Sequence, residues 1–445
     1  MGWTSYNRQM PKKNEEVFVC SNCGTEYGKW QGRCDGCGEW NSLKQFKVSR
    51  STTASSRKIV SGKIEVVNLA KIEKIGDNEM IYSSQIAELD RVLGKGIVRG
   101  SVILFAGEPG IGKSTLLTQS VGKIGGLYVA GEESGEQVLM RVKRVGVDAT
   151  KIDVLETNDV DRVIDFLEQK KKDYKLVVVD SIQMMASGQI VGAAGSVSQI
   201  RESAFRLIEV AKRLKTTVVI IGHVTKTGDI AGPKLLEHMV DVVLSFEGEK
   251  NSEVRLVRAK KNRFGGVDEI GLFRMGAKGL EEIDGKINLA DGEISRVGAV
   301  LSVVIEGNRP MLLEMQALVT ESFGPSPKRV FRGIEFNRGQ LLVAVLQKSL
   351  NVPLYKDDVY VTISGGISVR DPGLDLAVIA ALYSSYKNKA YGLVGKNRPV
   401  FVGEVSLLGG VRKANMQEKR QKEIERMGME IVKIGDVREL KNLVI

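Results

Sequence analysis

A glycine-rich octapeptide carries the residue types that bind a polyphosphate. It fits the spacing G-x-x-x-x-G-K-[ST] of a phosphate-binding P-loop. Glycines let successive backbone N–H groups turn inward around phosphate oxygens, and the next helix adds partial positive charge from its N-terminus. We expect Lys113 to reach the β- and γ-phosphates of ATP and Ser114 to ligate Mg²⁺. The expected ATP-binding residues are Gly107, Glu108, Pro109, Gly110, Ile111, Gly112, Lys113, Ser114 and Thr115. A glycine-rich turn that matches by chance is the alternative.

Carboxylates follow two other apolar runs. Asp180 ends the run 176–180, a Walker B pattern that is expected to hold Mg²⁺ through water. Glu132 and Glu133 follow the run 126–130, where a carboxylate can orient or deprotonate an attacking water. We favour Glu132 as the catalytic residue. The alternative is an acidic pair that only complements a helix N-terminus.

All four cysteines lie within eighteen residues, in the pattern Cys20-x2-Cys23-x10-Cys34-x2-Cys37. Two Cys-x-x-Cys pairs at this separation are typical of a structural zinc site with four thiolate ligands. Disulfides are the alternative, but an intracellular protein disfavours them. Trp30 stands near this cluster, where it either packs on the small domain or stacks on bases, and the same choice applies to Trp40.

The motifs need a scaffold that brings them together. The run 101–106 predicts a buried strand before the P-loop, and a helical pattern begins at Thr115. Strands and helices alternate from about 64 to 285, which predicts an α/β domain with a mainly parallel sheet. We therefore expect a zinc finger at 1–40, a basic linker at 41–63, this α/β domain at 64–285, and a second α/β unit at 286–445.

Composition limits the class of protein. The chain has 445 residues, 42% of them hydrophobic, which is enough for two or three globular domains. No run of about eighteen apolar residues is present, and the basic N-terminus lacks the apolar stretch of a secretory signal. We expect a cytoplasmic protein. The formal charge of +11 and the pI near 9.3 favour a polyanionic partner, with nucleic acid first.

Several phrases together resemble a known family. Residues 88–94, the P-loop and 129–133 are similar to the core of RecA-type ATPases. With the four-cysteine finger in front and Lys261-Asn262-Arg263-Phe264-Gly265 behind, nearly the whole chain resembles the RadA (Sms) family of bacterial DNA repair proteins. The C-terminal unit resembles the proteolytic domain of Lon protease.

The resemblance implies a fold and a function. The fold is α/β: a RecA-like P-loop ATPase core with a small N-terminal zinc ribbon and a C-terminal Lon-protease-like domain. The function is that of a DNA-dependent ATPase and helicase-like translocase in homologous recombination and DNA repair. Such a protein uses ATP, Mg²⁺ and Zn²⁺ and processes single-stranded and branched DNA with a RecA-type recombinase. It works as a homo-oligomer, a hexameric ring.

Ring ATPases place nucleotides between subunits, so the resemblance implies residues that act on a neighbour. Alternate residues of an extended segment point the same way, so Lys261 and Arg263 are expected to face a neighbour's γ-phosphate. Contact with DNA phosphates is the alternative role of this pair, as is membership of a basic surface patch. His223 ends the strand 217–221 and stands where a γ-phosphate sensor or a polar cap would stand.

Two glycine-rich segments, 186–196 and 226–234, follow core strands at the places of the DNA-binding loops in RecA-like proteins. Basic side chains on and beside them are expected to meet DNA phosphates, with ordinary flexible loops as the alternative. The expected DNA-binding residues are Lys226, Lys234, Arg201, Lys261 and Arg263, with Arg206 assisting.

Two other functions compete with the motor. A Lon-like domain suggests an ATP-dependent protease, but Gly373 stands where the nucleophilic serine belongs, and an ungapped alignment puts Glu418, beside Lys419, at the position of the lysine base. A DNA-binding scaffold without hydrolysis is disfavoured because the P-loop and both carboxylate motifs are present. Basic residues of the C-terminal unit offer a further DNA path or a solvated surface: Lys328, Arg329, Arg332, Arg338 and Lys348.

Overall fold

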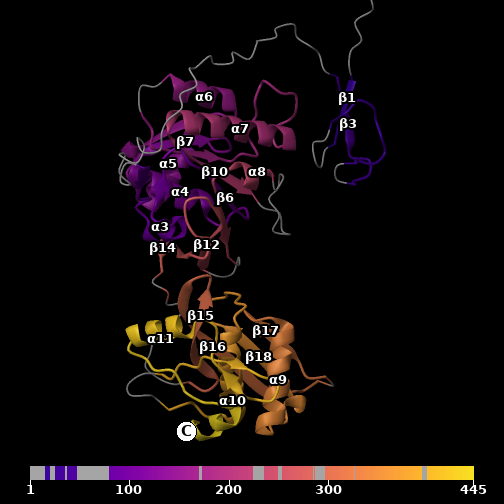
Figure 1. The fold of residues 1–445 in the computed structure, drawn as a ribbon, viewed down its shortest axis with the longest axis vertical. Coiled ribbons are helices and arrows are strands. Elements are labelled where there is room, and N and C mark those ends of the chain that lie inside the picture. The colour runs from indigo at the N-terminus through magenta and orange to yellow at the C-terminus, as the bar shows by residue number, and fades with distance from the viewer. Residues whose placement is uncertain are drawn as a thin grey trace, which may run out of the picture.

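The computed structural model describes residues 16–20, 26–35, 38–47, 80–169, 173–223, 235–248, 253–283, 285, 296–324, 326–392 and 398–444. Within these residues the chain forms a small N-terminal sheet, a large central sheet and a C-terminal sheet (Figure 1).

The N-terminal sheet has the order β2-β1-β3 in the described residues. It consists of β1 (Glu16–Cys20), β2 (Glu26–Tyr27) and β3 (Leu43–Lys47), all antiparallel. The predicted linker at 41–63 is therefore wrong at its start, because β3 pairs with β1 along five residues. Leu43 is buried with Cys20 and Cys34, which explains why this segment belongs to the sheet.

The central sheet contains nine strands in the described residues, in the order β14-β13-β12-β11-β6-β10-β9-β7-β8. The parallel strands are β6 (Val102–Gly107), β7 (Gly126–Ala130), β8 (Ile152–Glu156), β9 (Leu176–Asp180), β10 (Thr217–His223) and β11 (Val242–Glu247). Antiparallel strands β12 (Val254–Asn262), β13 (Ile270–Gly276) and β14 (Gly279–Glu282) extend one edge. A short pair, β4 (Ile81–Tyr82) and β5 (Ile97–Val98), lies apart from it.

Helices cover both faces of the central sheet (Figure 1). One face packs on α3 (Ala87–Leu93), α4 (Lys113–Ile124) and α5 (Gly135–Val145), which is followed by a 3₁₀ turn, η1 (Ala149–Lys151). The other packs on α6 (Val160–Glu168), α7 (Val197–Leu214) and α8 (Leu235–Met239). Alternate residues of β6 enter the two cores, so Phe105 faces one and Leu104 the other. Burial on both faces explains why the parallel strands read as continuous apolar runs.

The C-terminal unit is built on a sheet with the order β15-β16-β18-β17 among the described residues. Its strands are β15 (Ala299–Glu306), β16 (Arg309–Glu321), β17 (Arg329–Arg332) and β18 (Asp357–Ile363). Two helices, α9 (Phe336–Leu350) and α10 (Asp375–Lys387), share one core with this sheet. A second core joins Leu301, Val303 and Leu312 to α11 (Gln417–Arg426). The remaining elements are β19 (Glu404–Val405), β20 (Val411–Arg412), η2 (Leu354–Lys356), η3 (Pro372–Leu374) and η4 (Val437–Asn442).

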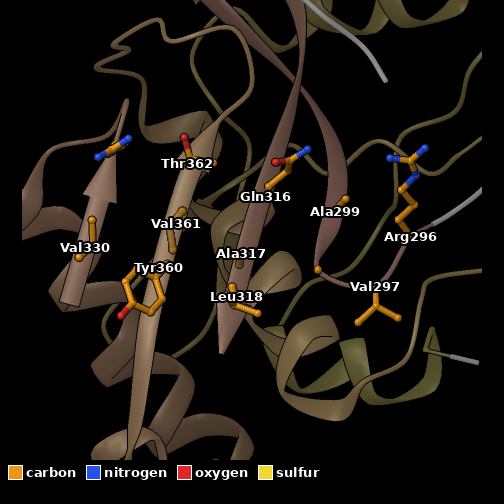
Figure 2. A pocket seen from close by; sticks show the side chains of 12 residues that line it. Arg296, Val297, Ala299, Gln316, Ala317, Leu318, Val330, Tyr360, Val361 and Thr362 are labelled. Atoms are coloured by element: carbon orange, nitrogen blue, oxygen red, sulfur yellow. The ribbon is translucent and has the colours of Figure 1, made fainter. Parts of the chain in front are cut away.

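Part of the sheet face opposite α9 and α10 lines a cavity of about 570 Å³ (Figure 2). One row of its lining crosses the strands in register, from Arg332 to Thr362, Gln316 and Ala299. Arg296 forms a bridge with Ala299 and places a second guanidinium at the other end of this row (Figure 2).

A buried arginine joins the C-terminal unit to the central domain. Arg309, at the start of β16, is 6% exposed and pairs with Glu88 of α3. Its other terminal nitrogen donates to the carbonyl of Ile283 at 3.0 Å. Val254 and Ile270 of the central sheet also belong to the C-terminal core, so the two units share apolar packing.

Candidate nucleotide-binding site

The P-loop lies at the carboxyl end of β6, where glycine is required for two reasons. Gly110 and Gly112 have φ angles of +77° and +114°, a backbone region that disfavours other residues. A Cβ atom on Gly112 would lie 2.7 Å from Met275 Cε, and one on Gly107 would lie 2.7 Å from the carbonyl oxygen of Phe246. Gly107 therefore approaches the Phe246 backbone only because it has no side chain, whereas the methionine end near Gly112 can move.

Lys113 begins α4 and is 4% exposed. Its Nζ donates to the carbonyl oxygens of Gly107 at 2.8 Å and Glu108 at 2.9 Å. Burial lowers the pKa of Lys113 to about 8, and the nearby Asp180 and Glu132 oppose this shift. The ammonium group thus lies inside the loop, where a bound polyphosphate would add negative charge next to it.

His223 ends β10 between the lysine and a carboxylate. Its Nδ1 lies 3.2 Å from Lys113 Nζ, and its Nε2 lies 3.6 Å from Glu132 Oε1. Burial, and next the charge of Lys113, lower the pKa of His223, so its ring is neutral at pH 7. The prediction from sequence offered a γ-phosphate sensor or a polar cap, and this position beside Lys113 is compatible with the sensor role.

Glu132 follows β7 and receives a hydrogen bond that the sequence analysis missed. The hydroxyl of Ser181, which is fully buried, donates to Glu132 Oε1. Ser181 comes directly after Asp180 at the same carboxyl edge of the sheet, and that adjacency was the available signal. The side chain of Glu132 remains 41% exposed, so water can reach its carboxylate.

Asp180 ends β9 and accepts a hydrogen bond from the hydroxyl of Tyr128 on the neighbouring strand β7. Burial raises the pKa of Tyr128 well above its usual value, which keeps the hydroxyl protonated. Arg141 of α5 donates to that hydroxyl at 2.9 Å and to Glu133 Oε2 at 2.6 Å. Sequence reasoning missed Tyr128 and Arg141, although a buried tyrosine hydroxyl in an apolar strand usually has a hydrogen-bond partner.

The donor set at this edge fits Mg²⁺-ATP. The Ser114 hydroxyl and the Asp180 carboxylate are oxygen ligands of the kind that Mg²⁺ takes alongside substrate phosphates. Lys113 and the amides of a glycine loop with positive φ angles provide for the phosphates themselves.

Lys261 and Arg263 lie near the amino-terminal ends of the parallel strands, whereas the P-loop lies at their carboxyl ends. Asn262 is in register with Val242, and Val242 with Ile103, four residues before the end of β6. At 3.3 Å per residue this is roughly 13 Å from the P-loop end of the strand. The pair therefore does not approach the P-loop of its own chain.

Both side chains bind groups near the amino-terminal ends of these strands. Lys261 Nζ donates to the carbonyl oxygens of Glu237, His238 and Val240 at 2.8, 3.1 and 2.7 Å, which closes the end of α8. Arg263 Nη1 lies 3.4 Å from Asp241 Oδ1 and its side chain is 53% exposed. Arg263 is the more accessible of the two.

The residues expected to meet DNA fall into three groups. Lys226 and Lys234 lie outside the described residues. Arg206 pairs with Asp161 and donates to Ser187 Oγ at 3.1 Å, so it holds the segment 186–196 rather than facing solvent. Arg201 is exposed on α7.

The glycine-rich segment 186–196 is organised by one buried amide. Gln199 of α7 is 1% exposed, and its Nε2 donates to the carbonyls of Ser187, Ile190 and Gly192 at 3.2, 3.0 and 3.2 Å. The backbone N–H of Ser187 returns a hydrogen bond to Gln199 Oε1 at 2.8 Å.

Two of the four predicted zinc ligands can be placed. Cys20 and Cys34, one from each Cys-x-x-Cys pair, are buried in the same cluster, as a shared site requires. Cys23 and Cys37 lie outside the described residues. Each placed thiol has a hydroxyl 3.2 Å away, Ser42 for Cys20 and Tyr27 for Cys34, and such groups suit thiolate ligands. Trp30 and Trp40 are 57% and 68% exposed, so neither is enclosed by the ribbon.

The C-terminal unit has an arginine where the alignment expected a base. Arg420 is 1% exposed, pairs with Asp371 and lies 3.0 Å from a Cβ built on Gly373. Placing Glu418 at that position, with Lys419 beside it, is therefore wrong, because Glu418 is exposed and Lys419 contacts Asn308. The site around Gly373 is filled by an ion pair.

The basic residues of this unit are not equally available. Arg338 pairs with the buried Asp375, and Arg329 donates to the carbonyls of Lys328, Asp357 and Leu354, which removes both from a free basic surface. Lys328, Arg332 and Lys348 remain exposed.

Comparisons with known proteins agree with this architecture. Residues 74–229 match the AAA domain family, and residues 18–45 match the family of the rubredoxin metal-binding domain. DNA repair protein RadA of Campylobacter jejuni is 42% identical over 92% of this chain and 92% of its own length. RadA proteins of Bacillus subtilis and Pseudomonas aeruginosa are 38% and 40% identical, over 94% and 95% of this chain and 91% and 94% of theirs. Within the described part of the chain, no helix has the length and apolar character of a membrane span.

Proposed function

Because the chain belongs to the RadA family of DNA repair proteins, we propose that it is a DNA-dependent ATPase. It moves along single-stranded and branched DNA in homologous recombination and repair, in the cytoplasm and together with a RecA-type recombinase. One observation supports the motor above all: Lys113, Glu132 and His223 meet at the P-loop, close to the Walker B carboxylate of Asp180. A DNA-binding scaffold that does not hydrolyse ATP would not need these three side chains around the phosphates.

The side chains divide the work of hydrolysis. Lys113 exchanges the loop carbonyls for the β- and γ-phosphates and holds their charge. Ser114 and Asp180 hold Mg²⁺, which when bound neutralises charge on the same phosphates. Glu132, fixed by Ser181, orients the attacking water, and neutral His223 contacts the γ-phosphate side of the site.

A neighbouring subunit completes the site. Lys261 and Arg263 lie at the edge of the sheet opposite their own P-loop, so any γ-phosphate they serve belongs to another chain. Arg263, more than half exposed, is the group that reaches across, and Lys261 holds the end of α8 beside it. A hexameric ring supplies such a neighbour to every subunit.

DNA lies against the basic side chains that remain available. Arg201 is exposed on α7, and Lys226 and Lys234 flank the second glycine-rich segment. The zinc ribbon, with Cys20, Cys34 and their two partner cysteines, supplies a further recognition module. Phosphate contacts of this kind make binding fall as salt rises.

The test is ATP turnover with and without single-stranded DNA, at matched salt. We expect DNA to increase turnover and branched DNA to be converted to separated products only when ATP is present. A chain that binds DNA but shows equal, negligible turnover in both conditions would instead be a scaffold.

A further inference from the structure

A chain of hydrogen bonds runs beneath the nucleotide site from α5 to the Walker B strand. The guanidinium of Arg141 donates from all three nitrogens: Nη1 to Glu133 Oε2 at 2.6 Å, Nε to Thr118 Oγ1 at 3.0 Å and Nη2 to the Tyr128 hydroxyl at 2.9 Å. The Tyr128 hydroxyl in turn donates to Oδ2 of Asp180. Four elements, α4, α5, β7 and β9, are thereby connected.

These groups are buried. Tyr128 and Thr118 are fully buried and Arg141 is 8% exposed. Burying a hydroxyl and a guanidinium is costly unless each is fully hydrogen-bonded, and a phenylalanine would fill the core position of Tyr128 without that requirement. The polar chain therefore calls for a role other than packing.

Both expected magnesium ligands are tied to the same arginine. Asp180 is reached through Tyr128, and the turn that carries Ser114 is reached through Thr118, whose hydroxyl donates to the carbonyl of Ser114 at 2.7 Å. The bond from Tyr128 occupies one carboxylate oxygen of Asp180 and fixes the rotation of that side chain, which leaves the other oxygen for the metal or its water.

Resting on the proposed ATPase function, we propose that Tyr128 and Arg141 are positioning residues for magnesium: they hold Asp180 and the Ser114 turn in the arrangement that binds Mg²⁺-nucleotide. Glu133 anchors Arg141 through their ion pair, whose carboxylate side is 39% exposed. The two neighbouring glutamates thus differ in role: Glu132 orients the attacking water, and Glu133 holds Arg141.

The experiment measures binding of fluorescently labelled ADP to the full chain, first in EDTA and then across a Mg²⁺ titration. Tyr128→Phe removes the hydroxyl and keeps the ring. Losing an outer partner of a metal ligand typically weakens metal binding 10- to 100-fold, so we expect the half-saturating Mg²⁺ concentration to rise about tenfold. Affinity for ADP in EDTA should stay within about twofold of the wild type, because Lys113 and the loop amides are untouched.

Tyr174→Phe is the matched control, because the Tyr174 hydroxyl donates to a different aspartate of the sheet, Asp153, at 2.7 Å. It should leave the Mg²⁺ titration unchanged. Glu133→Gln weakens the anchor from the surface and should shift the titration in the same direction by a smaller factor. If Tyr128→Phe does not fold, Glu133→Gln decides the question alone.

A Tyr128→Phe titration that matches the wild type, or one that loses ADP affinity equally with and without Mg²⁺, overturns the positioning role. The proposed function is judged separately by DNA-stimulated turnover of the wild type. A wild-type chain that binds Mg²⁺-ADP but does not hydrolyse ATP would refute the motor and leave the Mg²⁺ titration to test the positioning role.

Discussion

At the scale of single residues, the main feature of the nucleotide site is the buried positive charge of Lys113. Lys113 is held by two loop carbonyls and its pKa is lowered to about 8 by burial, which marks a position prepared for an anion. Its Nζ bonds to the P-loop carbonyls and lies beside His223, so removing the charge should affect phosphate binding more than folding.

We predict that Lys113→Ala lowers ATP turnover by at least about 100-fold, as loss of one charge-stabilising donor typically does. The unfolding temperature should change little. Lys123→Ala is the control, because Lys123 lies on the same helix, is exposed and donates only to the carbonyl of Gln85 at 3.0 Å. Wild-type turnover in Lys113→Ala would refute the P-loop assignment.

Much of the site could be predicted at this scale, and the missing part has one physical cause. Lys113, Glu132 and Asp180 each follow an apolar run, and parallel strands bring their carboxyl ends to one edge. Tyr128 on Asp180 and Arg420 beside Gly373 are contacts between segments about 50 residues apart in sequence, which local patterns do not encode.

At the scale of elements, loops and strand ends rely on backbone geometry that few residues accept. Gly112 combines a positive φ with a Cβ position 2.7 Å from Met275 Cε, whereas Gly146 at the end of α5 has a φ of +73° and open space around its Cβ. Substitution of Gly146 therefore tests backbone strain alone, whereas substitution of Gly112 adds a close contact with Met275.

We predict that Gly112→Ala and Gly146→Ala each cost on the order of 1–2 kcal/mol of stability, because both force a side chain into a left-handed backbone. Only Gly112→Ala should also weaken nucleotide binding, because Gly112 lies in the P-loop directly before Lys113, whereas Gly146 follows the end of α5. Equilibrium unfolding and labelled-ADP binding measure the two effects. Equal ADP affinity in both variants would contradict a tight P-loop.

The zinc ribbon is a second element whose stability depends on chemistry more than on size. Its described core holds Cys20, Cys34 and Leu43, too little apolar surface to fold alone. We predict one zinc per chain, and its loss in Cys34→Ser by elemental analysis, while Ser42→Ala retains it. A full equivalent of zinc in Cys34→Ser would place the metal elsewhere.

At the scale of the whole molecule, a buried ion pair and shared apolar packing join the C-terminal unit to the central domain. Arg309 and Glu88 are both under 10% exposed, and Arg309 also donates to the carbonyl of Ile283. The sequence predicted two separate domains but not this contact, because its partners are 221 residues apart.

We predict that Arg309→Ala destabilises the chain by about 3–5 kcal/mol, because the buried Glu88 carboxylate loses its buried cation and keeps only the half-exposed Arg91, at 3.6 Å, as an ion-pair partner. Arg438→Ala is the control, since that arginine pairs with its near neighbour Asp436 on the surface and should cost under about 1 kcal/mol. Denaturant unfolding compares the two. Equal midpoints would show that the two units are not held by this pair.

Subunit mixing tests completion of the site by a neighbour. Lys113→Ala chains lack the phosphate charge and Arg263→Ala chains lack the group that reaches across. We predict that each alone is inactive and that co-assembled mixtures recover turnover at junctions where an intact P-loop meets an intact Arg263. Absence of recovery in mixtures shown to co-assemble would favour DNA contact for Arg263.

The placement of the P-loop and Arg263 at opposite edges of one sheet makes each subunit directional. The proposed role of Arg263 favours a head-to-tail assembly, in which the P-loop of each chain meets Arg263 of the next. An open row of subunits always ends in one P-loop without a neighbour, whereas a closed circle has none. ATP turnover per chain should therefore rise with each added subunit and reach its full value only when the ring closes. The rate of hydrolysis would then report whether the ring is open or closed.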